Sequence, residues 1–324
     1  MATNDDIPQV SHEGVVAAAA RIASVATRTP LLPLPGFANI WLKAESLQLG
    51  GAFKFRGAYN RLARVPAADR PRGVVAFSSG NHAQGIARAA ALLGLPATIV
   101  MPADAPSVKR NATLSLGAEV VTYDRATESR EQIAAALATE RGAVLVPSFD
   151  DPDVVEGQGT AGLEAAFQAT ALGLPPFERA VICCGGGGLS AGITLALRDA
   201  EIVVVEPVGW DDMGRSLAAG TILPVEPNPP ATACDALQTL RVAPLTFDVL
   251  HAAGARGVAV SEAKIRAAMR HAFGLGLVVE PGGAVALAAI LSGHVPADGR
   301  QTLVTLSGGN VDPAAYAAVL AEQA

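Results

Sequence analysis

Short runs of β-branched residues alternate with longer alanine-rich segments along nearly the whole chain. The short runs have the length and composition of buried strands, and the alanine-rich segments have the periodicity of helices. A chain that alternates strands with helices forms parallel sheets whose two faces are covered by those helices. The predicted strands cover residues 40–43, 73–77, 97–101, 119–123, 143–146, 180–183, 202–205, 257–260 and 302–306.

This number of predicted strands indicates two α/β units rather than a single sheet. Residues 48–146 hold a compact run of strand–helix pairs, and we predict that they form a smaller domain. This domain is inserted into a larger domain made of residues 1–47 and 147–324. The predicted fold class is therefore α/β, with two open, twisted parallel sheets. The predicted helices cover residues 12–26, 58–65, 81–93, 107–116, 127–141, 154–171, 189–198, 261–273 and 282–291.

Charge and composition narrow the possible function classes. The chain has 324 residues, of which 50% are hydrophobic, and a net charge of −6. No basic surface is expected, so neither nucleic acid nor an anionic membrane is a predicted partner. The N-terminus is acidic, and the apolar segment of a signal peptide does not follow it. The three cysteines (Cys183, Cys184, Cys234) do not have the spacing of zinc ligands, and their odd number does not fit a disulfide framework. Both features favour a reducing, cytoplasmic location.

Lys54 is one of only four lysines, against twenty arginines, and it lies between Phe53 and Phe55 after a glycine pair. In an apolar site an amine loses its charge and becomes a nucleophile. Arginine cannot do this, because its guanidinium stays protonated. The alternative is an ordinary lysine at a helix start, with its stem packed on phenylalanine and its amine in water. The flanking residues alone leave both interpretations open.

Four consecutive glycines, Gly185 to Gly188, follow a predicted strand and precede a predicted helix. Their backbone N–H groups and the helix N-terminus form an anion-binding cradle that suits a phosphate group. The ligand remains open, because the spacing Gly186-x-Gly188-x-x-Ala191 also satisfies the dinucleotide-binding fingerprint. Glu206, at the end of the next predicted strand, lies where a ribose-binding acid is expected. An NAD(P)-dependent oxidoreductase is therefore an alternative function.

Polar side chains also gather at the ends of other predicted strands. Residues 78–82 offer hydroxyl, amide and N–H donors for a carboxylate, although a helix cap would use the same residue types. Residues 307–310 follow the last strand and by themselves indicate only a turn. Glu206 and Asp212, with backbone carbonyls between them, could hold a hard cation through oxygen, although surface acids are the commoner outcome.

Together, and in this order, these motifs resemble those of the fold-type II pyridoxal-phosphate (PLP) enzymes, in particular the serine/threonine dehydratases (threonine ammonia-lyases) and serine racemases. The shared signature comprises an Ala-Phe-Lys-x-Arg-Gly motif, a Ser-Ser-Gly-Asn-His loop, the tetraglycine loop and a late Ser-Gly-Gly-Asn segment. The resemblance extends from about Thr27 to Val311. It implies a fold like that of the tryptophan synthase β chain, and a homodimer. The chain departs from many members in lacking hydroxyl groups at Gly50 and Ala52.

The resemblance also implies a role for each motif. Lys54 carries PLP as a Schiff base, Phe53 packs near the cofactor ring, Asn81 bonds its phenolic oxygen, and Ser307 meets its pyridine nitrogen. Residues that hold the cofactor phosphate are Gly185, Gly186, Gly187, Gly188 and Leu189. Residues that bind the substrate carboxylate are Ser78, Ser79, Gly80, Asn81 and His82.

Two further roles follow from the same resemblance. Ser79 matches the residue that acts as acid and base on the opposite face of the substrate in the racemases. Glu206 and Asp212, by their side chains, and Trp210, by its backbone carbonyl, match the divalent-cation site of this subgroup. Magnesium or calcium would suit such an oxygen-only set of ligands.

The implied reaction is a β-elimination in which Lys54 takes the α-proton, the β-hydroxyl leaves, and hydrolysis gives a 2-oxo acid and ammonia. The hydroxyl of Ser307 cannot keep the pyridine nitrogen protonated, which suits prompt elimination better than transamination. The predicted substrate is L-threonine, L-serine or a relative such as 3-hydroxyaspartate. An amino-acid racemase with the same cofactor is the nearest alternative, and a non-catalytic amino-acid sensor of this fold is a further one.

Overall fold

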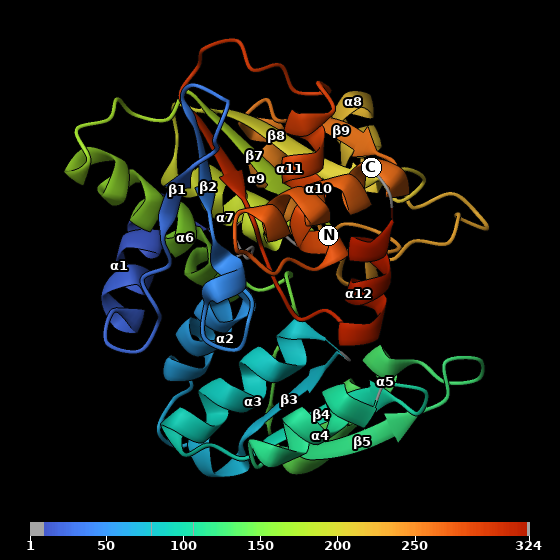
Figure 1. Cartoon of the computed structure of the whole chain (residues 1–324). Coiled ribbons are helices and arrows are strands. Elements are labelled where there is room, and N and C mark those ends of the chain that lie inside the picture. The colour runs from blue at the N-terminus through green and yellow to red at the C-terminus, as the bar shows by residue number, and fades with distance from the viewer. Residues whose placement is uncertain (1–9, 79, 106, 323–324) are drawn as a thin grey trace.

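The computed structural model describes residues 10–78, 80–105 and 107–322. In this part of the chain the strands form two separate sheets, which lie one above the other in Figure 1. The larger sheet has the strand order β1-β2-β10-β7-β8-β9, and the smaller has the order β5-β4-β3-β6. The α/β class and the presence of two sheets agree with the prediction.

The larger sheet is parallel except at one edge, where β1 pairs antiparallel with β2. The expectation of purely parallel sheets is wrong there. The strand β1 also lies outside the predicted strands, because it has only three residues and ends in a proline that an edge strand tolerates. The strands of this sheet are β1 (Leu31–Pro33), β2 (Ile40–Lys43), β7 (Arg179–Cys183), β8 (Glu201–Pro207), β9 (Arg256–Val260) and β10 (Thr302–Thr305).

The smaller sheet is parallel throughout and comprises β3 (Val74–Phe77), β4 (Ala97–Pro102), β5 (Glu119–Tyr123) and β6 (Val144–Leu145). Alternate residues of its strands face opposite layers. Val74 and Ala76 pack toward α3 (Asn81–Leu93), whereas Val75 packs toward α5 (Arg130–Arg141). These strands lie between β2 and β7 in the sequence, so the smaller unit interrupts the larger. The domain boundaries after residues 47 and 146 stay a prediction.

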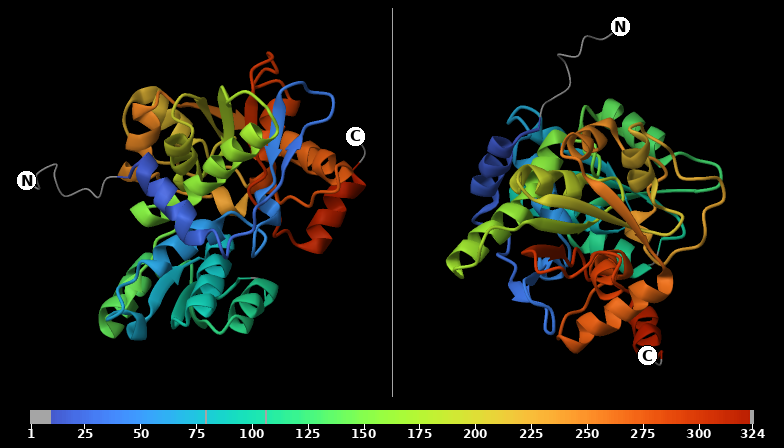
Figure 2. Two further views of the ribbon diagram at one scale, coloured as in Figure 1. Left: turned by 90° about the vertical axis from the view of Figure 1, so that its left-hand side faces the viewer. Right: turned by 90° about the horizontal axis from the view of Figure 1, so that it is seen from above.

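Helices cover both faces of the larger sheet (Figures 1 and 2). The helix α7 (Gly188–Ala196) connects β7 to β8, and α11 (Pro281–Leu291) lies in the connection from β9 back to β10. Since these right-handed connections cross the sheet in opposite directions, the two helices lie on opposite faces. The remaining helices are α1 (His12–Ile22), α2 (Lys54–Ala63), α4 (Ser107–Ser115), α6 (Pro152–Ala171), α8 (Asp212–Ala219), α9 (Pro244–Ala252), α10 (Glu262–Gly274) and α12 (Pro313–Ala321).

Several helices differ from the predicted ones. The helix α2 begins at Lys54 rather than at residue 58, and α1 ends at Ile22 rather than at residue 26. The helix α5 begins at Arg130 because the Ser129 side chain accepts a hydrogen bond from the backbone N–H of Gln132 and so caps it. The helices α8, α9 and α12 lie outside the predicted set. In the described residues, no helix has both the length and the hydrophobicity needed to cross a membrane.

Glycine contacts explain how α6 packs closely between α2 and α7. A Cβ on Gly57 of α2 would lie 2.6 Å from the Val154 carbonyl oxygen of α6. A Cβ on Gly159 of α6 would lie 2.5 Å from the Gly192 carbonyl oxygen of α7. Gly57 is therefore a contact residue inside α2, which begins earlier than predicted.

Candidate active site

A cavity of about 730 Å³ lies where the two units meet. Its walls include the C-terminal residues of β3 and β7 and the loop after β10, the strand ends at which open α/β sheets bind ligands. Ser79 lies outside the described residues. The other residues predicted to contact PLP or the substrate carboxylate all line this cavity: Phe53, Lys54, Ser78, Gly80, Asn81, His82, Gly185, Gly186, Gly187, Gly188, Leu189 and Ser307.

Lys54 is the first residue of α2 and reaches into the cavity. Its Nζ donates a hydrogen bond to the Ser148 carbonyl oxygen at 2.9 Å and lies 5.1 Å from the centre of the Phe53 ring. Burial lowers the pKa of the amine from 10.5 to about 8. A lysine with this pKa is neutral, and so nucleophilic, far more often near neutral pH than an exposed lysine.

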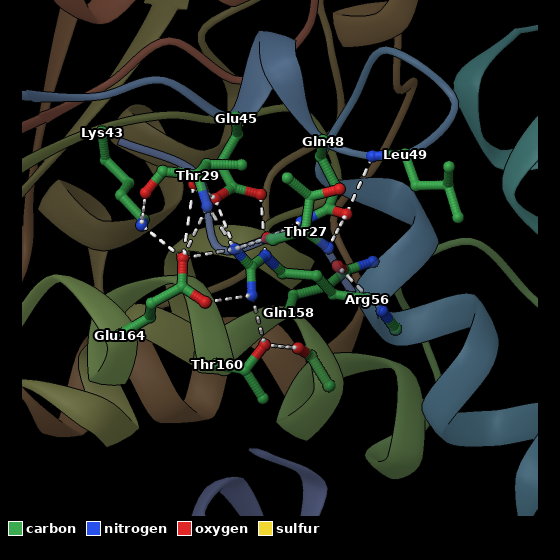
Figure 3. Close-up of polar contacts among 12 residues, drawn as sticks. Thr27, Thr29, Lys43, Glu45, Gln48, Leu49, Arg56, Gln158, Thr160 and Glu164 are labelled. Carbon is green, nitrogen blue, oxygen red and sulfur yellow. Dashed lines mark hydrogen bonds and ion pairs between the residues drawn. The ribbon is translucent and has the colours of Figure 1, made fainter. Parts of the chain in front are cut away.

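Arg56, two residues further along α2, enters a buried ion network (Figure 3). Its guanidinium donates to both Glu45 carboxylate oxygens at 2.8 Å and to Glu164 Oε1 at 3.0 Å. Lys43 Nζ donates to the same Glu164 oxygen at 2.6 Å. Burial alone would lower the pKa of Arg56, but the Glu45 and Glu164 carboxylates raise it. Two cations thus face two carboxylates, as buried charges require.

This network attaches α2 to the larger unit, because Lys43 belongs to β2, Glu45 follows it, and Glu164 belongs to α6. Side chains two residues apart in a helix project about 200° from one another. Holding Arg56 against the larger unit therefore directs Lys54 to the other side of α2, where the cavity lies.

The segment before α2 pairs with the loop after β10. The Phe53 N–H donates to the Ser307 carbonyl oxygen at 3.0 Å, and the Gly309 N–H donates to the Gly51 carbonyl oxygen at 2.8 Å. Ala52 and Gly308 form an antiparallel bridge between these hydrogen bonds. The lysine motif and the late Ser-Gly-Gly-Asn motif are thus neighbours in space although they are far apart in the sequence.

The tetraglycine loop runs from the end of β7 into α7, whose first backbone N–H groups have no partner within the helix. Gly187 has a φ of 86°, which favours glycine. A Cβ on Gly187 would lie 2.7 Å from Met213 Cε, and one on Gly186 would overlap the Phe149 ring. The loop therefore needs glycine for its packing, and it presents a helix N-terminus to the cavity as an anion site requires.

The loop of residues 78–82 leads from β3 into α3. No described side chain caps α3, whose N-cap residue is Gly80. His82 is buried, and its Nε2 lies 3.1 Å from the Val146 carbonyl oxygen. Burial and then the nearby Lys54 charge lower the pKa of His82 to about 3. His82 is therefore neutral, with Nε2–H donating to Val146, and it brings no positive charge to a substrate carboxylate.

Glu280 is a cavity residue that the sequence motifs did not reveal. It directly precedes α11, and its Oε1 accepts a hydrogen bond from Asn81 Nδ2 at 2.6 Å. Burial and then the charge of Asp235 raise the pKa of Glu280 to about 7. The sequence does contain a sign that Glu280 is unusual, because it is the only charged residue within the apolar stretch of residues 275–291.

The cationic side chains that line the cavity, besides Lys54, are Lys109, Arg130 and Arg241. Lys109 forms an ion pair with Asp235 at 2.6 Å, which joins α4 of the smaller unit to a short 3₁₀ helix of the larger (Asp235–Leu237). The Arg130 guanidinium lies 5.7 Å from the centre of the Phe77 ring, at the end of β3. Arg130 thus stands beside the strand that leads directly into the loop of residues 78–82.

The predicted cation ligands Glu206 and Asp212 are both fully buried. Glu206 accepts hydrogen bonds from the N–H groups of Met213 and Gly214, whereas neither carboxylate oxygen of Asp212 has a partner among the described residues. Burial raises the pKa of both carboxyls, that of Asp212 to about 7. Within the described ranges, no group of three or more His, Cys, Asp or Glu side chains could hold a metal ion. A cation here would therefore need backbone carbonyls, such as that of Trp210, or water.

Comparison with known proteins finds similarity along almost the whole chain. A family profile described as "Pyridoxal-phosphate dependent enzyme" matches residues 22–308. The L-threo-3-hydroxyaspartate ammonia-lyase of a Pseudomonas species is 43% identical over 320 residues, which cover 96% of this chain and 98% of the relative. The serine racemase of Schizosaccharomyces pombe is 35% identical, with 98% of this chain and 100% of the relative covered.

Solved structures are also similar to this chain along almost its whole length. The crystal structure of a threonine deaminase from T.th. superposes with a TM-score of 0.85 at 42% identity and covers 93% of this chain and 99% of that one. The structure of maize serine racemase superposes with a TM-score of 0.88 at 33% identity, with 94% and 95% of the two chains covered. The family profile, which spans residues 22–308, includes the strands of both sheets and the residues that line the cavity.

Proposed function

Because this chain belongs to the family of pyridoxal-phosphate dependent enzymes, we propose that it catalyses β-elimination from a 3-hydroxy amino acid to give a 2-oxo acid and ammonia. The observation that carries this proposal is the buried amine of Lys54, with its pKa lowered to about 8, in a cavity that also holds a helix-end anion cradle. This combination favours PLP over a dinucleotide, because PLP forms a covalent bond with a lysine amine and a dinucleotide does not.

The residues that line the cavity fit PLP. Lys54 supplies the amine, the Gly185–Gly188 segment with Leu189 supplies N–H donors for the phosphate, and Ser307 supplies a neutral hydroxyl for the pyridine nitrogen. Phe53 offers a ring beside Lys54, and Asn81 offers an amide donor for the phenolic oxygen. When bound, PLP accepts the electron pair that remains at Cα after its proton is removed.

The protein's own groups would perform the remaining steps. Lys54, with a pKa of about 8, is suited to take the α-proton at neutral pH. Ser78, Ser79, Gly80, Asn81 and His82 would hold the substrate carboxylate through N–H and hydroxyl donors. Because His82 is neutral, it adds no positive charge to the carboxylate site.

We further propose that the preferred substrate carries a second carboxylate, as 3-hydroxyaspartate does. Of the cavity cations, we favour Arg130 over Arg241 as the group that binds it, because Arg130 flanks the strand that leads into the carboxylate loop. The ion pair of Arg130 with Glu131 is exposed and contributes little free energy, so Arg130 can exchange it for a substrate carboxylate. Lys109, in contrast, is already paired with Asp235. The Pseudomonas relative named for this substrate supports the proposal.

A substrate panel tests the proposed reaction and the second carboxylate together. L-threo-3-hydroxyaspartate, L-serine and L-threonine are assayed for 2-oxo acid, ammonia and the opposite enantiomer. Arg130→Ala should lower kcat/KM for the dicarboxylate about 10- to 100-fold, since a charge-assisted hydrogen bond is lost, and change that for L-serine little. Arg141→Ala, the same change outside the cavity, is the matched control. Equal loss for both substrates would refute the role of Arg130, and no oxo acid from any substrate would refute the elimination.

Racemisation is a second candidate function, which the similarity to serine racemases favours. Ser79 would be the acid and base on the face of the substrate opposite Lys54. Ser79→Ala should then suppress racemisation and turnover of D-substrates while sparing much of the L-elimination. Equal loss of both activities would contradict this division of labour.

We also propose that Glu206, Asp212 and the Trp210 carbonyl hold Mg²⁺ or Ca²⁺. Two buried carboxyls, one with no hydrogen-bond partner in the described residues, fit a hard cation that accepts oxygen ligands. Removing divalent ions with a chelator should lower the melting temperature, and adding either ion back should restore it. Unchanged stability and activity after chelation would count against the site.

We propose, finally, that the enzyme is a cytoplasmic homodimer. The dimer is supported by the resemblance of its motifs to the fold-type II family. The location is supported by the three cysteines, whose odd number and spacing fit neither a disulfide framework nor a zinc site. Light scattering after gel filtration tests the assembly, and a monomer mass would contradict it. Fractionation of the source cells tests the location.

A further inference from the structure

Asn310, the last residue of the Ser-Gly-Gly-Asn motif, makes two side-chain hydrogen bonds, one of them to Asn81, which lines the cavity. Its Nδ2 donates to the Gly50 carbonyl oxygen at 2.7 Å and to Asn81 Oδ1 at 2.8 Å. Asn81 Nδ2 in turn donates to Glu280 Oε1 at 2.6 Å. Three segments that are distant in the sequence, after β2, after β10 and at the start of α3, thus meet through one chain of amides.

The order of these groups fixes which way each amide faces. A backbone carbonyl can only accept a hydrogen bond, so the Asn310 atom that faces Gly50 must be nitrogen. That nitrogen uses both of its hydrogens, one on Gly50 and one on Asn81, so the Asn81 atom beside it must be oxygen. The Asn81 nitrogen is then left to face Glu280, and among the described residues its second hydrogen has no acceptor.

The packing around these amides leaves little room for another arrangement. A Cβ on Gly51 would overlap the Asn310 side-chain amide. A Cβ on Gly308 would overlap Glu280 Oε1 and lie 3.1 Å from Asn81 Nδ2. Glycine in both motifs therefore allows Asn310, Asn81 and Glu280 to approach one another. Asn81 itself is the first residue of α3, whose N-cap, Gly80, offers no side chain to orient it.

We propose that Asn310 is a positioning residue that sets the direction of the Asn81 amide, so that Asn81 presents a donor hydrogen to the phenolic oxygen of PLP. This inference rests on the proposed function, because it assumes that Asn81 contacts the cofactor. Asn310 acts only through Asn81 and does not touch the reacting atoms.

A double-mutant cycle tests this role through cofactor binding rather than activity. The apoenzymes of the wild type, Asn310→Ala, Asn81→Ala and the double variant are titrated with PLP, and both the dissociation constant and the visible absorption spectrum are recorded. Asn310→Ala should raise the dissociation constant about tenfold and change the spectrum, since one oriented hydrogen bond is lost. In the Asn81→Ala background the same substitution should change the constant less than about twofold.

If Asn310→Ala raised the dissociation constant of PLP equally in both backgrounds, the proposal would be overturned. Asn310 would then act only by holding the loop at Gly50. If Asn310→Ala fails to fold, Asn310→Asp preserves the size of the side chain but removes its donors. Asn310→Asp should weaken PLP binding when Asn81 is present and change it little in the Asn81→Ala variant. Equal weakening in both backgrounds would again overturn the positioning role of Asn310. Failure of the wild-type protein to bind PLP at all would instead refute the proposed function.

Discussion

At the scale of single residues, the site depends on polar groups whose burial changes their protonation. Burial lowers the pKa of Lys54 to about 8 and, with the Lys54 charge, that of His82 to about 3, and raises that of Glu280 to about 7. Each shift favours the neutral form of the group, as desolvation requires. The cavity therefore combines a reactive amine with a neutral imidazole and a carboxyl that titrates near neutrality.

The pKa of Lys54 predicts how fast the apoenzyme captures PLP. Only the neutral amine attacks the cofactor, so the rate constant should rise about tenfold per pH unit below pH 8 and level off above it. Stopped-flow absorbance over this pH range measures the rate. A rate that keeps rising to pH 10 would contradict the lowered pKa.

The same shift predicts a pH effect on the stability of the apoprotein. Between about pH 8 and 10.5 the unfolded chain keeps a proton on Lys54 that the folded chain has released. The contribution of Lys54 to the free energy of unfolding therefore increases as the pH rises through this range. Below pH 8 both states carry the proton and this contribution is flat. Urea unfolding of the wild type and Lys54→Met at several pH values isolates the effect, and identical slopes above pH 8 would show that the pKa is not lowered.

At the scale of elements, α2 is held from two sides. Arg56 joins it to β2 and α6 through buried carboxylates, and the segment before it pairs with the loop after β10. The helix α6 then packs against both α2 and α7 at backbone distance. The position of Lys54 therefore follows from packing of the larger unit, not from its neighbours in sequence.

Arg56→Ala should lower the free energy of unfolding by about 3–5 kcal/mol, because it removes the cation that pairs with the buried Glu45 carboxylate and leaves Glu164 with Lys43 alone. Arg125→Ala, which breaks the exposed ion pair with Asp104, should cost less than about 1 kcal/mol. Chemical unfolding of both variants provides the comparison. Similar losses would mean that the network does not anchor α2.

Gly159→Ala should destabilise the protein by about 1–3 kcal/mol, because its Cβ would lie 2.5 Å from the Gly192 carbonyl oxygen and push α6 from α7. Gly274→Ala is the matched control, since nothing lies within 4 Å of its Cβ. It should leave the stability unchanged or raise it slightly, because alanine favours helix more than glycine does. Thermal melts compare the two, and equal melting temperatures would contradict close α6–α7 packing.

At the scale of the whole molecule, strand patterning was sufficient to predict the two sheets and the loops at their carboxyl ends. Each predicted strand has a counterpart in the structure, and each PLP or carboxylate loop borders the cavity where it is described. The antiparallel β1 and the helices α8, α9 and α12 were missed, because they are short and take their place from packing against distant elements. Glu280 was missed for a similar reason, since its contact with Asn81 spans 199 positions in the sequence.

The central claim is that Lys54 carries the cofactor, and borohydride reduction tests it most directly. The purified holoenzyme should be yellow, and reduction should bleach it and fix PLP covalently to one lysine. Peptide mass spectrometry should find the added mass on Lys54 and not on Lys43, Lys109 or Lys264, which are the other lysines of the chain. A label on one of those lysines, or a colourless protein with no label, would contradict the account.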